Sequence, residues 1–425
     1  MELLPTAFLI DSLSVYKNLR NDPVVSGLYN CVLKLYTTAS ANDQLSAVQA
    51  YTSMCHALYE SEYNGNLADY LFDLVLYDVN VFTNACARGE YEKLSQEIKS
   101  AAATDLEALC KLSLVTDSQI KAAFKKKFIH MPELIDILPS YSISHRQYAA
   151  GSEWGENIET ISRFYQENGT GMYAKYKAFL YDSERGILPV HNTDPIRISD
   201  LKQYEVQRQK IIDNTLGFLE GHPYNNVLLY GDRGTGKSST VKALLNEYGD
   251  QKLRMIEISK RCLSDLDKLI QEVQHIPLKF ILFIDDLTFN ENDDNFGILK
   301  AALEGSLSTR PDNVAIYATT NRRHLIKETF SAREGNEVHR ADTIDENLSL
   351  SDRFGLMVTF TKPSKDGFLA IVRQLAADRG LEIDEQKLTS GAERFALAKG
   401  GRTPRLAKQY IDHLEARMKL NLEIL

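Results

Sequence analysis

The stretch from Asn226 to Leu245, NVLLYGDRGTGKSSTVKALL, has residue types and spacing suited to holding phosphate groups. It fits the pattern GxxxxGK[ST] at every fixed position, directly after an apolar strand and at the start of a helix. Glycines let consecutive main-chain N–H groups curl around phosphates, and the helix N-terminus adds the positive end of its dipole. The sequence therefore predicts a site for a nucleoside triphosphate, formed by Gly231, Asp232, Arg233, Gly234, Thr235, Gly236, Lys237, Ser238 and Ser239.

Two side chains of this motif and two acidic residues further along have the chemistry to handle the phosphates. We expect Lys237 to reach the β- and γ-phosphates and the Ser238 hydroxyl to bind Mg²⁺. The apolar run KFILFIDDL ends in Asp285, a second candidate ligand for Mg²⁺, and Asp286, which would orient the attacking water. A glutamate is usual at the latter position, and aspartate is one methylene shorter, so slow hydrolysis is one expectation.

Three more polar residues follow in an order that phosphoryl transfer would use. Asn321 ends the apolar run VAIYATTN, Arg353 lies in LSLSDRFG before the last predicted strand, and Arg405 lies in GGRTPRLAKQY. Taken singly, each arginine is better explained as a surface or salt-bridge residue than as a catalytic one. Transfer of the γ-phosphate needs charge neutralisation, however, and an arginine supplied by a neighbouring subunit is one way to provide it. We therefore include all three among the candidate catalytic residues.

The pattern of apolar residues changes along the chain and predicts different kinds of domain before, around and after these candidate residues. Residues 11–127 repeat apolar positions three and four apart, which predicts five or six helices of an all-α domain extending to residue 190. A proline-containing stretch then predicts a boundary near His191. Short apolar runs at 226–230, 253–259, 278–285, 313–320 and 356–361 alternate with amphipathic stretches, which predicts a parallel sheet covered on both faces at 191–362. Residues 363–425 are helical in pattern.

The composition of the 425 residues narrows the class of protein. No window approaches the roughly 18 consecutive apolar residues of a membrane span. The five cysteines form no CxxC pair, so free thiols in a reducing cytoplasm are expected. Of the net charge of −9, about −7 falls before His191. An acidic first half argues against a grip on a phosphate backbone, which calls for clustered lysine and arginine.

Taken in order, these motifs resemble those of AAA+ ATPases from Ile196 to Leu425. More narrowly, the run from Asp200 to Tyr248 resembles an uncharacterised bacterial AAA+ family, a domain of unknown function. The resemblance implies an α/β fold with strand order 5-1-4-3-2 and a helical lid, with ATP and Mg²⁺ bound between them. It implies that Asn321 acts as sensor 1, Arg405 as sensor 2 and Arg353 as an arginine finger on the next subunit.

The resemblance also implies ring assembly, for example as a hexamer, and an adenine site. Leu201 and Lys202 fall where AAA+ proteins wall the adenine, although Gln203 replaces the glycine usual at the next position.

Three kinds of work remain open for such an ATPase. The first is remodelling or assembly of a protein partner that binds the N-terminal domain, and this is the function we favour. The second is a nucleic-acid factor of the initiator or helicase-loader type. The third is a nucleotide-gated scaffold with slow hydrolysis. Threading of polypeptide is disfavoured, because the segment after the second strand, SKRCLSD, has Lys260 and Arg261 and no aromatic residue.

The segment 331–350, SAREGNEVHRADTIDENLSL, is long, charged and without periodicity. Loops of that length are often functional or disordered. We expect it to become ordered when a neighbouring subunit or a client binds.

Overall fold

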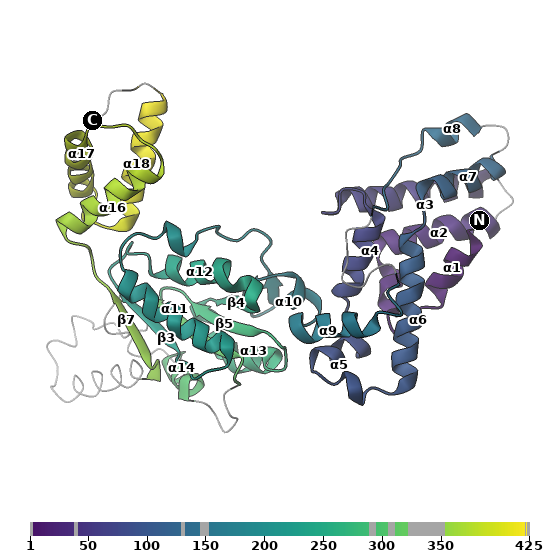
Figure 1. Cartoon of the computed structure of the whole chain (residues 1–425), viewed down its shortest axis with the longest axis horizontal. Helices are drawn as coiled ribbons and strands as arrows, with labels where there is room; N and C mark the ends of the chain where they lie inside the picture. The colour runs from purple at the N-terminus through teal and green to yellow at the C-terminus, as the bar shows by residue number, and fades with distance from the viewer. Residues whose placement is uncertain are drawn as a thin grey trace. The chain divides into compact units, whose positions relative to one another are not determined.

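The computed structural model describes residues 3–37, 41–128, 132–144, 153–288, 295–304, 311–321, 353–420 and 422. The chain divides into two compact units, Met1–Lys175 and Tyr176–Leu425, whose elements are labelled in Figure 1.

The first unit contains only helices among its described residues. They are α1 (Leu4–Asp11), α2 (Pro23–Thr37), α3 (Ala41–Glu60), α4 (Leu67–Leu76), α5 (Val81–Ala87), α6 (Gln96–Ser113), α7 (Asp117–Lys127), α8 (Pro132–Asp136), α9 (Ile158–Asn168) and α10 (Gly171–Lys175). Six of them, α2 to α7, lie within residues 11–127, where the sequence predicted five or six, and α1 ends at Asp11, where that range begins. No helix among those described in either unit has both the length and the apolarity that crossing a membrane would require.

Polar residues before the helices fix where several of them begin. The Asn66 side chain accepts hydrogen bonds from the first N–H groups of α4, and Thr116 and Gln119 form a capping box on α7. At the centre of the unit the hydroxyl of Tyr165 donates to the carbonyl of Val75 at 2.6 Å. The Tyr16 hydroxyl lies 3.1 Å from that of Tyr165, so the turn after α1 is tied to α9 inside the core.

The second unit alternates strands and helices and ends in three helices. Its elements are β1 (Ala178–Asp182), β2 (Gly186–Pro189), α11 (Glu205–Glu220), β3 (Val227–Gly231), α12 (Lys237–Tyr248), β4 (Leu253–Ile258), α13 (Leu266–Val273), β5 (Lys279–Ile284), α14 (Asn295–Glu304), β6 (Val314–Thr320), β7 (Leu356–Phe360), α16 (Lys365–Asp378), α17 (Glu385–Ala398) and α18 (Pro404–Lys419).

The seven strands form one sheet in the order β2-β1-β4-β5-β6-β3-β7. All neighbours are parallel except β1 and β2. When β3 to β7 are counted as strands 1 to 5, their order is 5-1-4-3-2. This order confirms the predicted fold class, which is an α/β sheet of AAA+ type with a helical lid, preceded in the sequence by an all-α region.

The hairpin of β1 and β2 was not predicted, and it moves the division between the two units. We expected an all-α domain extending to residue 190 and a boundary near His191, whereas both strands belong to the sheet and the second unit begins at Tyr176. Phe179 and Tyr181 point into the core while Leu180 is about half exposed, so the strand buries one face and exposes the other.

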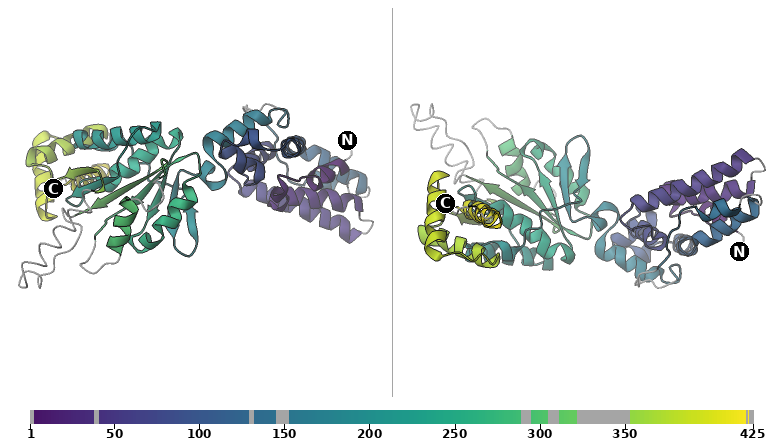
Figure 2. Two further views of the ribbon diagram at one scale, coloured as in Figure 1. Left: turned by 90° about the horizontal axis from the view of Figure 1, so that it is seen from below. Right: turned by 90° about the horizontal axis from the view of Figure 1, so that it is seen from above.

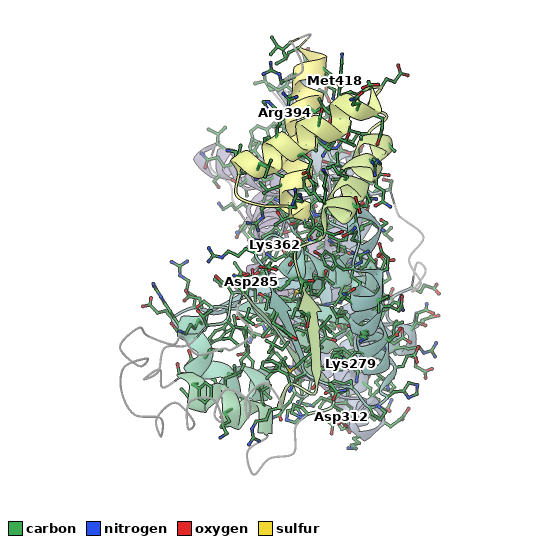
Figure 3. The ribbon with its side chains drawn as sticks, turned by 90° about the vertical axis from the view of Figure 1, so that its left-hand side faces the viewer. Lys279, Asp285, Asp312, Lys362, Arg394 and Met418 are labelled. Carbon is green, nitrogen blue, oxygen red and sulfur yellow. The ribbon has the colours of Figure 1, made fainter. Side chains whose placement is uncertain are left out.

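Helices cover both faces of the sheet, which explains the continuous apolar strands. Ile211 and Phe218 of α11 and Val241 and Leu244 of α12 pack on one face, against strand residues such as Leu229. Figure 2 shows α13 and α14 on the opposite face. The lid helices α16, α17 and α18 have their own apolar core, and Thr403 caps the last of them. Figure 3 shows the lid above the end of the sheet that carries Asp285 and Lys362, with Lys279 and Asp312 at the other end.

Candidate functional site: a phosphate loop beneath a helical lid

The phosphate loop begins where β3 passes closely along β7. Gly231 has φ of +136°, and a Cβ at this position would lie 2.1 Å from the carbonyl oxygen of Phe360, so only glycine fits. The Asp232 N–H donates to that same carbonyl at 3.0 Å, and the Asp232 carboxylate accepts from the N–H of Lys362 at 2.9 Å. The loop is therefore fixed to the end of β7 by its first two residues.

The remaining loop residues complete a turn that leads into α12. Gly234 and Gly236 have φ of +75° and +96°, in the left-handed region that favours glycine. The Thr235 hydroxyl donates to the carbonyl of Asp232 at 2.8 Å, which closes the turn. Arg233 is exposed, and Ser239 lies half-buried in the first turn of α12. The nine residues predicted to bind phosphate, Gly231 to Ser239, thus form one loop and the first turn of α12.

Lys237 lies under the loop and is almost fully buried. Its ammonium donates to the carbonyls of Gly231 at 2.8 Å and Asp232 at 2.7 Å, and to the Asn321 side-chain oxygen at 3.0 Å. Burial is the main reason that its pKa is lowered, and it outweighs the nearby carboxylates, which raise the pKa. An anionic ligand bound at the loop would therefore interact strongly with the buried Lys237 ammonium.

Ser238 and Asp285, the two predicted metal ligands, are in direct contact. The Ser238 hydroxyl donates to the Asp285 carboxylate at 2.6 Å, and the Thr319 hydroxyl donates to the same carboxylate oxygen at 2.5 Å. Hydroxyl and carboxylate oxygens are hard donors, and Mg²⁺ is bound in proteins by one or two such groups together with phosphates and water. The donor set therefore fits the predicted ion.

Asp286 and Asn321 are also paired. The Asn321 amide donates to the Asp286 carboxylate at 2.6 Å, so one carboxamide links this carboxylate to the ammonium of Lys237. Asp286 has φ of +51°, a conformation that aspartate tolerates better than most residues. Its N–H donates to the Thr319 hydroxyl at 3.0 Å, which fixes the turn at the end of β5.

The lid closes over these residues and leaves a cavity. The main-chain N–H of Arg405, in the first turn of α18, donates to the carbonyl of Gly234 at 3.2 Å. A cavity of about 700 Å³ lies here, within the usual range for ligand pockets. Its lining residues are Asp232, Arg233, Gly234, Asp286, Thr288, Asn321, Lys362, Lys399, Gly400, Gly401, Thr403, Arg405 and Leu406. Arg402 is not among them, and its guanidinium is paired with Glu393 at 2.7 Å.

Arg353 lies at the other end of the sheet. It is exposed and precedes β7, whereas the loop is joined to Phe360 at the strand's carboxyl end. The extended strand from Leu356 to Phe360 alone spans about 13 Å, and Arg353 precedes it by a further turn, which is beyond the reach of an arginine side chain. The structure therefore does not bring Arg353 together with the other predicted site residues of its own chain.

Leu201 lies on a segment that runs beside β7 and the lid but is not among the residues that line the cavity. The adjacent Gln203 lies against Gly367 of α16, and the Tyr204 hydroxyl donates to the carbonyl of Thr361 at 2.6 Å. Gln203 occupies the position where glycine is usual in AAA+ proteins. Its φ of +59° puts the backbone in the left-handed region, although the side chain is that of glutamine.

The region also contains polar residues that were not predicted. Thr319 contacts both aspartates, and Lys362 and Lys399 line the cavity. The threonine belongs to an apolar strand, and single lysines form no motif, so the sequence had no signal for them. The predicted interaction segment 331–350 lies outside the residues that the structure describes.

Comparison with known proteins gives a family for the second unit. The chain matches no curated protein. Solved structures of Thermotoga maritima RuvB are similar to it at low identity. One point mutant of RuvB is 17% identical with a TM-score of 0.38, over 53% of this chain and 66% of that chain. The protein titled as the Holliday junction branch migration motor is 16% identical with a TM-score of 0.38, over 54% of this chain and 68% of that chain.

A family described as "Protein of unknown function (DUF815)" matches residues 174–418, and this range contains β1, β2, the whole phosphate loop and the lid. Because the match covers more than half of the chain, this protein belongs to the DUF815 family.

Proposed function

We propose that this protein is an ATPase of AAA+ type, which binds ATP with Mg²⁺ in the cavity between the phosphate loop and the lid. The observation that carries the proposal is the position of Lys237, buried under the loop beside the contacting pair of Ser238 and Asp285. A cation of the kind that binds phosphates thus lies next to two oxygen groups of the kind that bind Mg²⁺, which supports the proposal. When bound, Mg²⁺ would neutralise charge between the β- and γ-phosphates.

In this proposal each neighbouring side chain has a distinct task. Asp286 accepts the proton of the attacking water or orients it, and Asn321 holds that carboxylate in place. Arg405 approaches the phosphates from the lid. Leu201 lies near the base of the nucleotide, on the segment beside β7.

Arg353 acts in our proposal on the nucleotide of an adjacent copy. Its position far from the loop of its own chain supports this, because the Arg353 side chain could then reach only a nucleotide bound to a neighbouring copy. The arrangement requires a ring or another repeating assembly. The helical unit, which carries most of the negative charge, would bind the protein partner that is remodelled or assembled.

A nucleotide-gated scaffold is the second candidate, and one observation favours it. The Asp286 carboxylate is short and is already engaged by Asn321 at 2.6 Å, which would slow the activation of water. Hydrolysis would then reset an assembly rather than drive continuous work.

The test is ATP turnover per subunit at several protein concentrations, for the wild type, Arg353→Ala and the control Arg394→Ala. Arg394 is an exposed lid arginine that does not line the cavity. We expect specific activity to rise with concentration in the wild type and control, and to be lost in Arg353→Ala while nucleotide still binds. Turnover that is independent of concentration and unchanged by Arg353→Ala would contradict the shared site. Slow turnover with stable ATP-dependent assembly would favour the scaffold.

A further inference from the structure

The lid side of the cavity holds more positive charge than the predicted motifs explain. We propose that Lys362 and Lys399 join Arg405 in a cation cluster that binds the polyphosphate of the nucleotide, and that this cluster makes lid closure depend on the number of phosphates. The proposal rests on the proposed function and extends it to two residues outside the motifs.

Lys362 is held at the boundary between the sheet and the lid. Its main-chain N–H donates to the Asp232 carboxylate at 2.9 Å, so the base of this side chain is fixed to the phosphate loop. Its ammonium lies 3.5 Å from the place that a Cβ on Gly401 would occupy, so it extends to the turn between α17 and α18. Figure 3 shows Lys362 between the sheet and the lid helices.

Lys399 and Arg405 reach the same cavity from the lid. Lys399 is the C-cap residue of α17, and with Gly400 and Gly401 it forms one wall of the cavity. Arg405 belongs to the first turn of α18, whose main chain is bonded to the loop at Gly234. The three cations therefore come from three different elements of the fold.

Within the part of the chain that the structure describes, none of these three cations has an ion-pair partner within 4.0 Å. Two other basic residues of the lid do, because Arg402 and Lys365 share Glu393 at 2.7 and 3.9 Å. Two acids also line the cavity, and Asp286 is paired with Arg233, a fourth cation of the lining, at 3.9 Å. Four cations against the two carboxylates of Asp232 and Asp286 leave the lining with an excess of positive charge.

The positive charges that line the cavity repel one another when the site is empty. A bound anion of high charge would offset this repulsion. A nucleoside triphosphate or diphosphate carries enough charge to contact all three cations, whereas a monophosphate does not. Because one cation belongs to the end of β7 and two belong to the lid, a shared polyphosphate ties the lid to the sheet. The chemical class recognised is therefore the polyphosphate, and the base contributes little to this part of the site.

The experiment compares Lys362→Gln and Lys399→Gln in the full chain with Lys365→Gln as the matched control. Lys365 is exposed, lies three residues beyond Lys362 and does not line the cavity. Displacement of a fluorescent ATP analogue would give Kd values for ATP, ADP, AMP and inorganic tripolyphosphate. We expect each cavity variant to weaken ATP, ADP and tripolyphosphate by about tenfold, as for one lost charge-assisted contact, and AMP by less than about twofold. Lys365→Gln should bind all four like the wild type.

Limited proteolysis provides the second measurement, because closure of the lid protects its turns. ATP should protect the α17–α18 turn in the wild type and the control but not in Lys362→Gln, even at saturating ATP. Wild-type affinity for ATP and tripolyphosphate in both cavity variants would overturn the cluster. If the wild type binds tripolyphosphate through Lys362 but does not bind ATP, the cluster stands and the proposed ATPase function fails. If the wild type binds neither anion, both proposals fail.

Discussion

The hydroxyl of Ser238, at the start of α12, donates a 2.6 Å hydrogen bond to the carboxylate of Asp285, at the end of β5. The phosphate motif and the acidic motif, 47 residues apart in sequence, therefore meet at a single contact. Both groups are oxygen donors of the kind that Mg²⁺ accepts, which makes this contact the most informative place to test metal dependence.

We expect Asp285→Asn to abolish the effect of Mg²⁺ on ATP binding. The neutral amide keeps the shape of the side chain but loses the charge that attracts the cation. Affinity for ATP in EDTA should stay within about threefold of the wild type, while the tightening by added Mg²⁺ should disappear. The control is Asp312→Asn, an exposed carboxylate at the opposite end of the sheet. A normal response to Mg²⁺ in Asp285→Asn would show that the metal is held elsewhere.

Asp286 should control turnover without controlling affinity. Asp286→Asn preserves the left-handed backbone, because asparagine tolerates positive φ as aspartate does. Removal of a general base typically lowers rates by about 10²- to 10⁴-fold, and we expect kcat to fall within that range while Kd for ATP is unchanged. Single-turnover hydrolysis and equilibrium binding would measure the two quantities. A kcat within a factor of two of the wild type would remove Asp286 from the catalytic residues.

Mixtures of two inactive variants should regain activity if the site is shared between copies. Lys237→Met removes the phosphate-binding cation but keeps Arg353, and Arg353→Ala has the reverse defect. In a mixed assembly the arginine of the first variant can serve the intact loop of the second. We expect mixed samples to hydrolyse ATP at about a quarter of the wild-type rate, with each variant inactive alone. Mixtures that remain inactive, although the variants are shown to co-assemble, would argue against action in trans.

Nucleotide binding should take up protons at alkaline pH because of Lys237. Burial lowers the pKa of its ammonium in the free protein, and phosphates in contact with it would raise that pKa again. Between the two pKa values binding therefore adds a proton. Calorimetric enthalpies measured over a series of alkaline pH values below the ordinary pKa of about 10.4 should differ between buffers of different ionisation enthalpy. Lys237→Arg, which does not titrate there, should remove the difference, and equal enthalpies in all buffers for the wild type would contradict the prediction.

The same lowered pKa predicts how stability depends on pH without nucleotide. Between the lowered pKa and the ordinary value of about 10.4, the unfolded chain binds more protons at Lys237 than the folded chain does. The contribution of this residue to the free energy of unfolding therefore rises with pH across that window. Thermal unfolding midpoints compared with those of Lys237→Arg would measure it.

The close passage of β3 along β7 predicts a severe loss of stability for Gly231→Ala. The added methyl group would lie 2.1 Å from the Phe360 carbonyl, at a backbone angle that alanine rarely adopts. We expect a loss of about 3 kcal/mol or more in the free energy of unfolding. Gly297→Ala in α14 is the matched control, since its methyl group meets nothing within 4 Å and should stabilise the protein by about 0.5–1 kcal/mol. Equal unfolding midpoints in the two variants would contradict this account.

The elements that the sequence predicted well were those with long or strongly patterned signals. The five apolar strands follow from strand hydrophobicity and the loop from Gly231 to Ser239 follows from a motif with fixed spacing, whereas the strand order was implied by the resemblance to AAA+ ATPases. The hairpin of β1 and β2 was missed because five residues with alternating burial, Ala178 to Asp182, are too few to stand out beside an aromatic helical pattern.

The cavity residues outside the motifs could not be predicted for a different reason. Lys362 and Lys399 are 37 positions apart and belong to no pattern. They meet only because the lid turn lies over the end of β7, which is a property of the folded chain. Thr319 was hidden among apolar neighbours, since its hydroxyl gains a role only from the two aspartates that end the adjacent strand.

The buried hydroxyl pair of Tyr16 and Tyr165 has a practical consequence for the search for a binding partner. A fragment of the helical unit used as bait must contain both tyrosines, because losing α9 would leave the Tyr16 hydroxyl without its acceptor in an apolar core. Bait fragments should therefore run from the N-terminus through Lys175. Those that stop near residue 150 are expected to aggregate and to capture proteins that recognise misfolded chains.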